Sequence, residues 1–163
     1  MSATLIDALA TSEPPQLDFT PRPGTLSVAE VTATVESWCV GKALSADRQA
    51  LLLALALLYH DHEAAAHELV QAREGQPDAD LIHAILHRRE GDAENAGYWW
   101  RAVGEHPVFP ALAAAAKRHD VPAGTGRYDP RAVVAAILAR GNVPGLRGWQ
   151  DEEFRMVAAH LNH

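Results

Sequence analysis

The chain has 163 residues, of which 48% are hydrophobic and 21% are charged. This composition is typical of one globular domain and excludes a disordered chain. Lysine and arginine number 14 against 21 aspartates and glutamates, which gives a net charge of −7. Because no basic block interrupts this acidic balance, the sequence argues against a nucleic-acid partner held through its phosphates.

Cysteine usage and the first residues of the chain favour a soluble, cytoplasmic protein. Cys39 is the only cysteine, so one chain forms neither an internal disulfide nor a multi-cysteine metal cage. The N-terminus lacks the basic start and apolar core of a secretory signal. The most apolar run, ALLLALALLY, is about half of the roughly 20 residues that cross a bilayer. We therefore predict no membrane partner.

Prolines divide the chain into two parts. Residues 11–24 contain four prolines and a glycine, a composition typical of extended or turn structure. The sequence predicts an N-terminal, proline-rich arm over residues 1–26, with room for a short helix at its start. A helical domain is predicted over residues 27–163.

Helix boundaries recur along that domain. Ser27 followed by Glu30 has the spacing of a capping box, and Ser45 can cap a second helix that is apolar on every side past Gln49. Aspartates and glycines then mark further starts and stops. Alternating apolar patterns typical of strands are missing, so the predicted fold is all-α. The expected helices cover about 28–40, 46–59, 61–74, 78–90, 92–103, 110–119, 129–140 and a final segment containing Phe154 and Leu161.

A weak internal repeat has an offset of 31 residues, which aligns Asp61 with Asp92. Ala96, Trp100 and Pro107 follow the pattern of the second helix in tetratricopeptide and Sel1-like repeats, in which a small residue, an aromatic residue and a proline recur. The chain resembles these families between residues 51 and 107, although Ala84 stands where their first helix has a glycine. The resemblance implies helical hairpins packed in a single compact, repeat-like domain.

A second resemblance rests on the stretches YHDHEAAAHELVQ and HRREGDAENAGYWWRAVGEHP. They are similar to an uncharacterised family of helical bacterial and fungal proteins, over most of residues 59–154. That resemblance implies one contiguous domain and brings no established activity with it.

The polar residues of LIHAILHRRE suggest a site. His83, His87 and Glu90 line up on one side of the predicted helix, and imidazoles one turn apart are a recurrent metal-ligand pair. The same row is equally compatible with a solvated helix edge. His62 falls in the apolar face of the preceding helix, where it either shares a metal such as zinc with His83 and His87 or donates to a carboxylate or backbone carbonyl.

Two arginines follow in the same helix. Arg89 lies on its apolar side, where an ion pair with Glu90, Asp92 or another acid would pin the hairpin. An anion site involving Arg88 or Arg89 is the alternative.

Two functions therefore stay open. The first is a binding module with a polar groove, which takes a small-molecule ligand, a protein partner or a second copy of the chain. The second is a small metal-assisted hydrolase in which His62, His83 and His87 hold the metal, Glu90 acts as general base, and Arg88 or Arg89 holds an anionic group. The residues predicted to line the groove of the binding module are His60, His67, Asn95, Tyr98 and Arg101.

Overall fold

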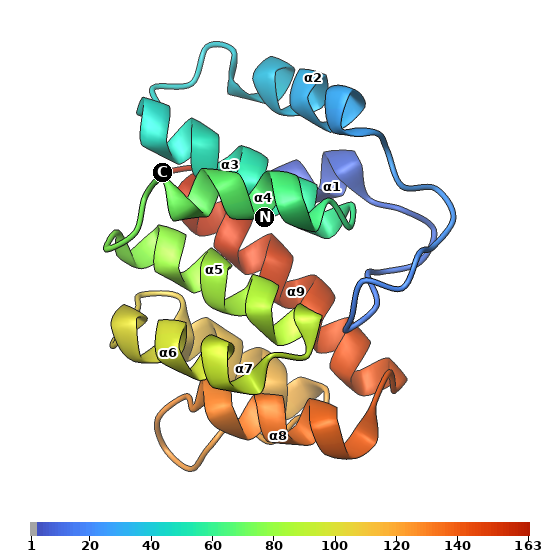
Figure 1. The fold of residues 1–163 in the computed structure, drawn as a ribbon, viewed down its shortest axis with the longest axis vertical. Coiled ribbons are helices and arrows are strands. Elements are labelled where there is room, and N and C mark those ends of the chain that lie inside the picture. Colours follow the sequence, from blue (N-terminus) through green and yellow to red (C-terminus); the bar gives the residue numbers. More distant parts are fainter. Residues whose placement is uncertain (1–2) are drawn as a thin grey trace.

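The computed structural model describes residues 3–163, and over this range the chain forms nine α-helices and no strand. The all-α prediction is confirmed. Figure 1 shows the helices in chain order. Their bounds are α1 (Leu5–Leu9), α2 (Val28–Cys39), α3 (Ala46–Tyr59), α4 (Glu63–Gln71), α5 (Pro77–Glu90), α6 (Ala93–Val103), α7 (Phe109–Arg118), α8 (Pro130–Arg140) and α9 (Pro144–Leu161).

Several helices begin at the predicted caps. The Ser27 side chain accepts a hydrogen bond from the Glu30 N–H, and the Glu30 carboxylate accepts one from the Ser27 N–H. The Asp92 carboxylate accepts from the Asn95 N–H at 3.0 Å and so starts α6. These bonds satisfy N–H groups that have no partner inside the helix.

Two predicted helix starts are wrong. Asp61 adopts a left-handed conformation with φ of 67°, and the residue that precedes α4 is His62. Helix α5 begins at Pro77 after Gln76, so Asp78 and Asp80 lie inside its first turn. The carboxylates of Asp61 and Asp78 bind side chains from distant parts of the chain instead.

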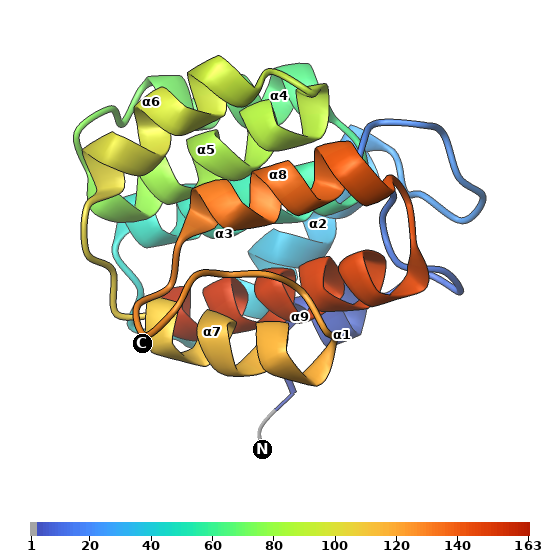
Figure 2. The ribbon, with the colours of Figure 1, turned by 90° about the horizontal axis from the view of Figure 1, so that it is seen from below.

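Helices α2 to α6 follow one another across the molecule, and α9 runs behind them (Figure 1). Seen from below, α4, α5 and α6 form one layer, while α1, α7 and α9 lie on the opposite side (Figure 2). Helix α3 lies between these layers and is buried at nearly every position from Leu51 to Tyr59. Its uniformly apolar sequence explains this central place.

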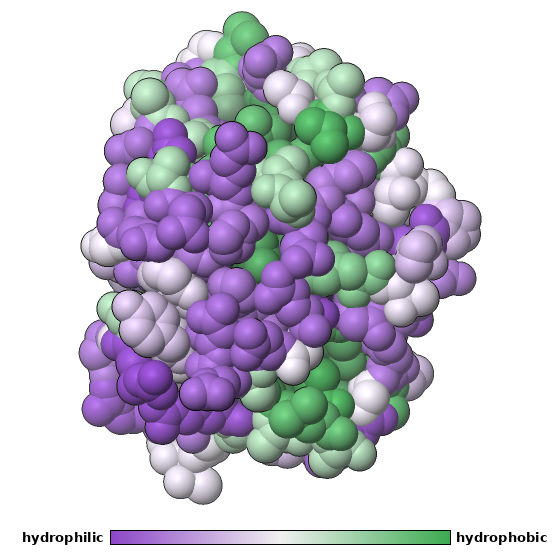
Figure 3. Space-filling view, viewed as in Figure 1, coloured by the Kyte–Doolittle hydropathy of each residue, from purple (hydrophilic) through white to green (hydrophobic). Residues whose placement is uncertain are grey.

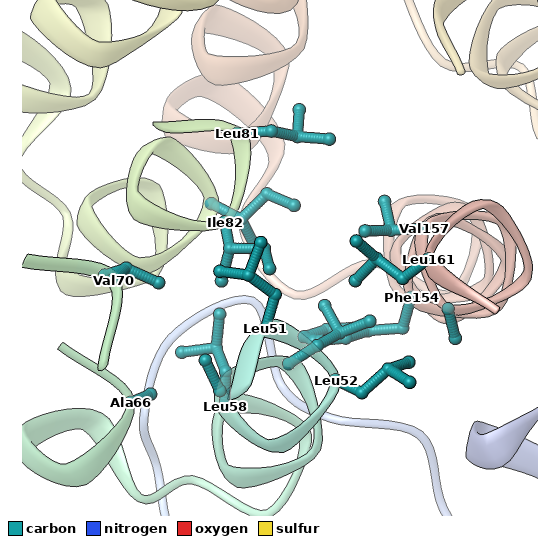
Figure 4. Packing of buried hydrophobic residues seen from close by; sticks show 14 of the residues in the cluster. Leu51, Leu52, Leu58, Ala66, Val70, Leu81, Ile82, Phe154, Val157 and Leu161 are labelled. Carbon is teal, nitrogen blue, oxygen red and sulfur yellow. The ribbon is translucent and has the colours of Figure 1, made fainter. Parts of the chain in front are cut away.

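The main core forms where α3 meets α4, α5 and α9 (Figure 4). Leu52 and Leu58 of α3 are fully buried, as are Ile82 of α5 and Phe154 of α9. Each such side chain contributes about 1.5–3 kcal/mol through burial. This packing fixes α5, which carries most of the residues singled out in the sequence.

The N-terminal arm packs against the helical domain. Leu5, Ile6 and Leu9 of α1 are buried in the main core, where α1 contacts α9 and α3. Downstream of α1, the Arg89 guanidinium receives the backbone of the arm, since it donates to the carbonyl oxygens of Gln16 and Asp18 at 3.2 and 2.7 Å. The arm is thus tied to the end of α5.

The face made by α4, α5 and α6 is mostly hydrophilic, with an apolar area at its lower edge over α8 (Figure 3). Among the helices of residues 3–163, none has both the length and the apolar character needed to cross a membrane.

Candidate functional site

Three imidazoles meet between α4 and α5. His67 comes from α4, and His83 and His87 come from successive turns of α5. One nitrogen of each ring can be chosen so that all three lie within 4.8 Å of one another. The rings of His83 and His87 are stacked with centroids 4.8 Å apart, and His67 meets His83 edge-on, also at 4.8 Å. His83 and His87 are buried, whereas His67 is half-buried. They are not a solvated edge.

The nitrogens of this triad are poorly supplied with hydrogen-bond partners. Nε2 of His83 lies 3.1 Å from Nε2 of His67, so only one of these two atoms can carry the shared proton. Nδ1 of His83 is buried and has no partner within residues 3–163. A buried ring nitrogen without a partner is uncommon and needs a reason.

Trp99 closes the site from α6. Its ring lies parallel to the His83 ring, with centroids 3.8 Å apart and an interplanar angle of 20°. Trp99 is a core residue with 9% exposure, and it also forms a wall of the triad. Helical spacing alone did not reveal this contact because α6 is a separate helix.

His87 has a carboxylate beside it. Its Nδ1 donates to Oε2 of Glu90 at 2.5 Å, which leaves Nε2 free. The amide nitrogen of Asn95 lies 3.3 Å from both ring nitrogens and is therefore aligned with neither lone pair. Asp92 is also close enough to form a group with His87 and Glu90.

Two side chains in and beside the triad have shifted pKa values. Burial, together with the neighbouring His87 and His67, lowers the pKa of His83 to about 4, so this ring is neutral at pH 7. A hydrogen bond with Glu90, along with burial, raises the pKa of Glu63 to about 7. Glu63 was not singled out in the sequence, and it adds a carboxyl group at the start of α4.

His62 and His60 lie outside the triad. Nε2 of His62 donates to the Leu26 carbonyl at 2.7 Å, so the prediction that His62 joins His83 and His87 is wrong, and the backbone alternative holds. His60 is 1% exposed, and its Nδ1 accepts from the Leu26 N–H at 3.1 Å. Both rings hold the end of the arm against the α3–α4 turn, and His60 is buried rather than set in an open groove.

Arg88 and Arg89 are also structural. Arg88 forms a two-pronged ion pair with Glu153 of α9, at 2.9 and 2.6 Å, and donates to Gln150. Arg89 donates to Asp61 at 2.8 Å and to the Leu58 carbonyl at 2.5 Å. The predicted ion pair of Arg89 therefore exists, with Asp61 as its acid. Because both guanidiniums are buried and occupied, the anion-holding role assigned to them is wrong.

The remaining predicted binding residues lie on α6. Asn95, Tyr98 and Arg101 line an open surface cavity of about 340 Å³ together with Asp92 and Glu94. Tyr98 is 57% exposed, with its ring edge-on to Trp99. Of these residues, Asn95 alone has a hydrogen-bond distance to the triad within the described part of the chain.

A second group of metal-type side chains gathers at the other end of α5. Oδ1 of Asp78 accepts from Nε2 of His106 and from Nε2 of His160, each at 2.8 Å. Nδ1 of His106 accepts from the Val108 N–H at 3.2 Å. Since Nδ1 holds a lone pair, the proton of neutral His106 is on Nε2, where it serves Asp78. This group is a hydrogen-bonded clamp between α5, the α6–α7 turn and α9.

A search of protein-family models, curated proteins and solved structures finds no match to the chain. The family resemblances therefore stay predictions, as do the cytoplasmic location and the absence of nucleic-acid and membrane partners. The function has to be inferred from the geometry.

Proposed function

We propose that this domain is a metal-binding module in which His67, His83 and His87 hold a divalent transition-metal ion, zinc being the first candidate. The observation that carries the proposal is the convergence of three imidazoles from two helices on one mostly buried point. Neutral imidazole is a preferred ligand for zinc, copper, iron and nickel. The proposal keeps the binding module predicted from the sequence and replaces His62 by His67 as a ligand.

The spacing of the nitrogens supports this ligand set. A tetrahedral ion with bonds of about 2.0–2.1 Å places its ligand atoms about 3.3 Å apart. His67 and His83 stand close to that spacing, with 3.1 Å between their Nε2 atoms. His87 offers a ring nitrogen within 4.8 Å of a nitrogen of each of the other two rings, a separation that a change in its side-chain torsions can reduce.

The hydrogen bonds around the rings support it as well. Metal-bound histidines commonly donate their other ring N–H to a carboxylate, which fixes the tautomer and the ring orientation. His87 has such a partner in Glu90, and the bond leaves Nε2 for the ion. Between His67 and His83, the two Nε2 atoms lie 3.1 Å apart with no other partner among the described residues, so an ion can replace the proton that they share. Glu90 thus orients His87 rather than acting as a base.

The test is metal uptake by untagged protein. We expect stripped protein to take up about one zinc ion per chain and its melting temperature to rise with zinc, because a ligand that binds the folded state alone stabilises it. His83→Asn and His87→Asn should abolish both effects. The matched control is His62→Asn, which changes the histidine that precedes α4 and binds the Leu26 carbonyl, and it should keep full zinc binding. If all three variants respond to zinc like the wild type, the triad does not bind the ion.

A metal-assisted hydrolase is the second candidate. Three protein ligands leave one position of a tetrahedral zinc open, as in catalytic zinc sites. Glu63, which is not one of the proposed ligands, supplies a carboxyl group next to Glu90. In that case, zinc-loaded protein should hydrolyse an activated ester such as p-nitrophenyl acetate, and Glu63→Gln should suppress turnover without loss of zinc. A rate equal to that of free zinc would rule this candidate out.

A further inference from the structure

A separate cavity of about 410 Å³ lies between α6, the start of α7 and the segment that leads into α8. Figure 1 shows these three helices in its lower part. Its volume falls within the range of small-molecule sites. None of the three triad histidines lines it. The cavity is therefore separate from the proposed metal site.

Aromatic side chains make up one part of its wall. Trp100, Phe109 and Tyr128 all line the cavity, and successive ring centroids are 6.3 and 5.0 Å apart. Trp100 and Phe109 are held almost fully buried by the main core, so these surfaces are rigid. A planar ring is the ligand group that packs best against such a wall.

A donor without an acceptor belongs to the same wall. Nε1 of Trp100 is buried and has no hydrogen-bond partner within residues 3–163, although the side chain is only 5% exposed. Indole N–H groups that are buried normally find an acceptor. Because this nitrogen is inaccessible, a ligand in the cavity meets the ring of Trp100 and not its N–H.

Positive charge lines the cavity as well. Arg101, Arg127 and Arg131 outnumber the two carboxylates of Glu105 and Asp129, in a chain whose net charge is −7. Arg127 is paired with Glu105. Over the described residues, no carboxylate lies within ion-pair distance of Arg101 or Arg131. Both guanidiniums are exposed and available to a ligand.

Two helices also begin in this wall. Phe109 and Pro110 open α7, and Pro130 and Arg131 open α8. The N-terminal ends of helices carry partial positive charge and favour anions. The Asp129 carboxylate already caps α8, and at α7 the Phe109 N–H donates to the His106 carbonyl while Pro110 has no N–H. The two unpaired arginines are therefore the main source of positive charge in this wall.

The clamp described above fixes one side of the cavity. His106, which is part of the lining, is held by Asp78 on one ring nitrogen and by the Val108 N–H on the other. This gives the α6–α7 turn a defined position in the absence of ligand, and a preformed site loses less entropy on binding.

We infer that this cavity is a binding site for a small planar organic anion, namely a ring that carries a carboxylate or a phosphate group. The ring packs against the wall of Trp100, Phe109 and Tyr128. The anionic group is held by Arg101 and Arg131.

Ligand-observed NMR with three simple probes tests this inference. Benzoate and phenyl phosphate carry the two anionic groups, and benzyl alcohol is the neutral comparison. At least one of the two anions should bind at least about tenfold more tightly than benzyl alcohol, and the tighter of them identifies the group that the site prefers. Binding of neither anion, or equal binding of all three probes, overturns the inference.

Substitutions inside and outside the cavity test where the anion binds. Arg131→Gln and Arg101→Gln should each weaken the preferred anion about tenfold or more, since both side chains are exposed and their loss leaves the core intact. Arg140→Gln removes the same charge from α8 outside the cavity and should leave the affinity unchanged. Equal affinities in all three variants would place the anion elsewhere and refute the assignment. Zinc binding plays no part in these measurements, so they stand apart from the proposed metal function.

Discussion

Two groups of side chains of the kinds that bind metals include residues of α5, one group near its start and one in its later turns. They differ in how many of their nitrogen atoms have a hydrogen-bond partner. At the start of the helix, Asp78 accepts from His106 and His160, and both nitrogens of His106 are engaged. Towards its end, Nε2 of His67 and Nε2 of His83 face each other at 3.1 Å, and neither has another partner among the described residues. A set of ligand-type residues therefore points to a metal only when lone pairs are left over.

The same distinction separates the other polar residues of α5. Arg88 and Arg89 look like functional residues in the sequence, yet each is buried with several acceptors around its guanidinium. These networks tie α5 to α9 and to the N-terminal arm. Replacing their members should cost stability and leave metal binding intact, whereas the triad should show the opposite behaviour.

The largest expected effect comes from Arg89→Ala. Removal of Arg89 leaves the Asp61 carboxylate with the longer ion pair to Arg22 alone, at 3.6 Å, and frees the carbonyls that tie the arm to α5. The free energy of unfolding should fall by about 3–5 kcal/mol, as for a buried pair that loses one partner. Urea denaturation measures this, with exposed Arg140→Ala as the control at about 0.5 kcal/mol or less. A loss below about 1 kcal/mol would show that the arm is not held through Arg89.

Asp78→Ala should have the next largest effect. The change leaves two imidazole N–H groups without their acceptor, at a cost of about 1–3 kcal/mol. The zinc-induced rise in melting temperature should persist in this variant. Loss of the zinc response in Asp78→Ala, with an intact response in His83→Asn, would show that zinc binds at Asp78, His106 and His160 and not at the triad.

A pH dependence follows from His60. Burial, together with the nearby Arg22, lowers its pKa to about 4, against 6.5 for a free histidine. The unfolded chain therefore binds more protons between these values, so the free energy of unfolding should fall as the pH drops from 6.5 to 4. The expected loss is about 1–2 kcal/mol between pH 7 and pH 5.

The control for that dependence is His60→Asn, whose side-chain oxygen can still accept from the Leu26 N–H. Urea midpoints at pH 7 and pH 5 should differ less in this variant than in the wild type. His83 has a pKa lowered in the same direction, so part of the slope should remain. An identical slope in both proteins would mean that His60 does not titrate in this range.

The smallest effect on stability is expected for His67→Asn. His67 is half-buried, and without metal its replacement should change the free energy of unfolding by no more than about 0.5 kcal/mol. With zinc at about 100 times its dissociation constant, the wild type should gain about 2.7 kcal/mol and the variant nothing. Thermal unfolding with and without zinc measures both values. A stabilised variant would exclude His67 as a ligand.

Much of the fold was predictable because it depends on local signals. The capping box of Ser27 and Glu30, the cap at Asp92 and the all-round apolar sequence of α3 act within one or two turns of helix. Asp61 was mistaken for a helix start because its partner, Arg89, lies 28 residues away. A sequence pattern within one helix does not show that a side chain binds a partner far along the chain.

The site was predictable only in part, for the same reason. His83 and His87 share a face of one helix, so their spacing revealed them. The choice between His62 and His67 depended on how α4 is rotated against α5 and on the Leu26 carbonyl that binds His62. Trp99 and the clamp partners of Asp78 come from other helices, and no periodicity within α5 indicates them.

Cobalt titration followed by visible absorption tests the central claim most directly, because bound Co²⁺ can occupy zinc-type sites and its spectrum reports on the ligand geometry. Wild-type protein and His62→Asn should each develop the intense bands of a tetrahedral nitrogen-ligated ion at one equivalent per chain, and zinc should displace them. His67→Asn, His83→Asn and His87→Asn should show only the weak spectrum of hydrated cobalt. A tetrahedral spectrum of wild-type strength in all three triad variants, or its absence in the wild type, would contradict a metal site at His67, His83 and His87.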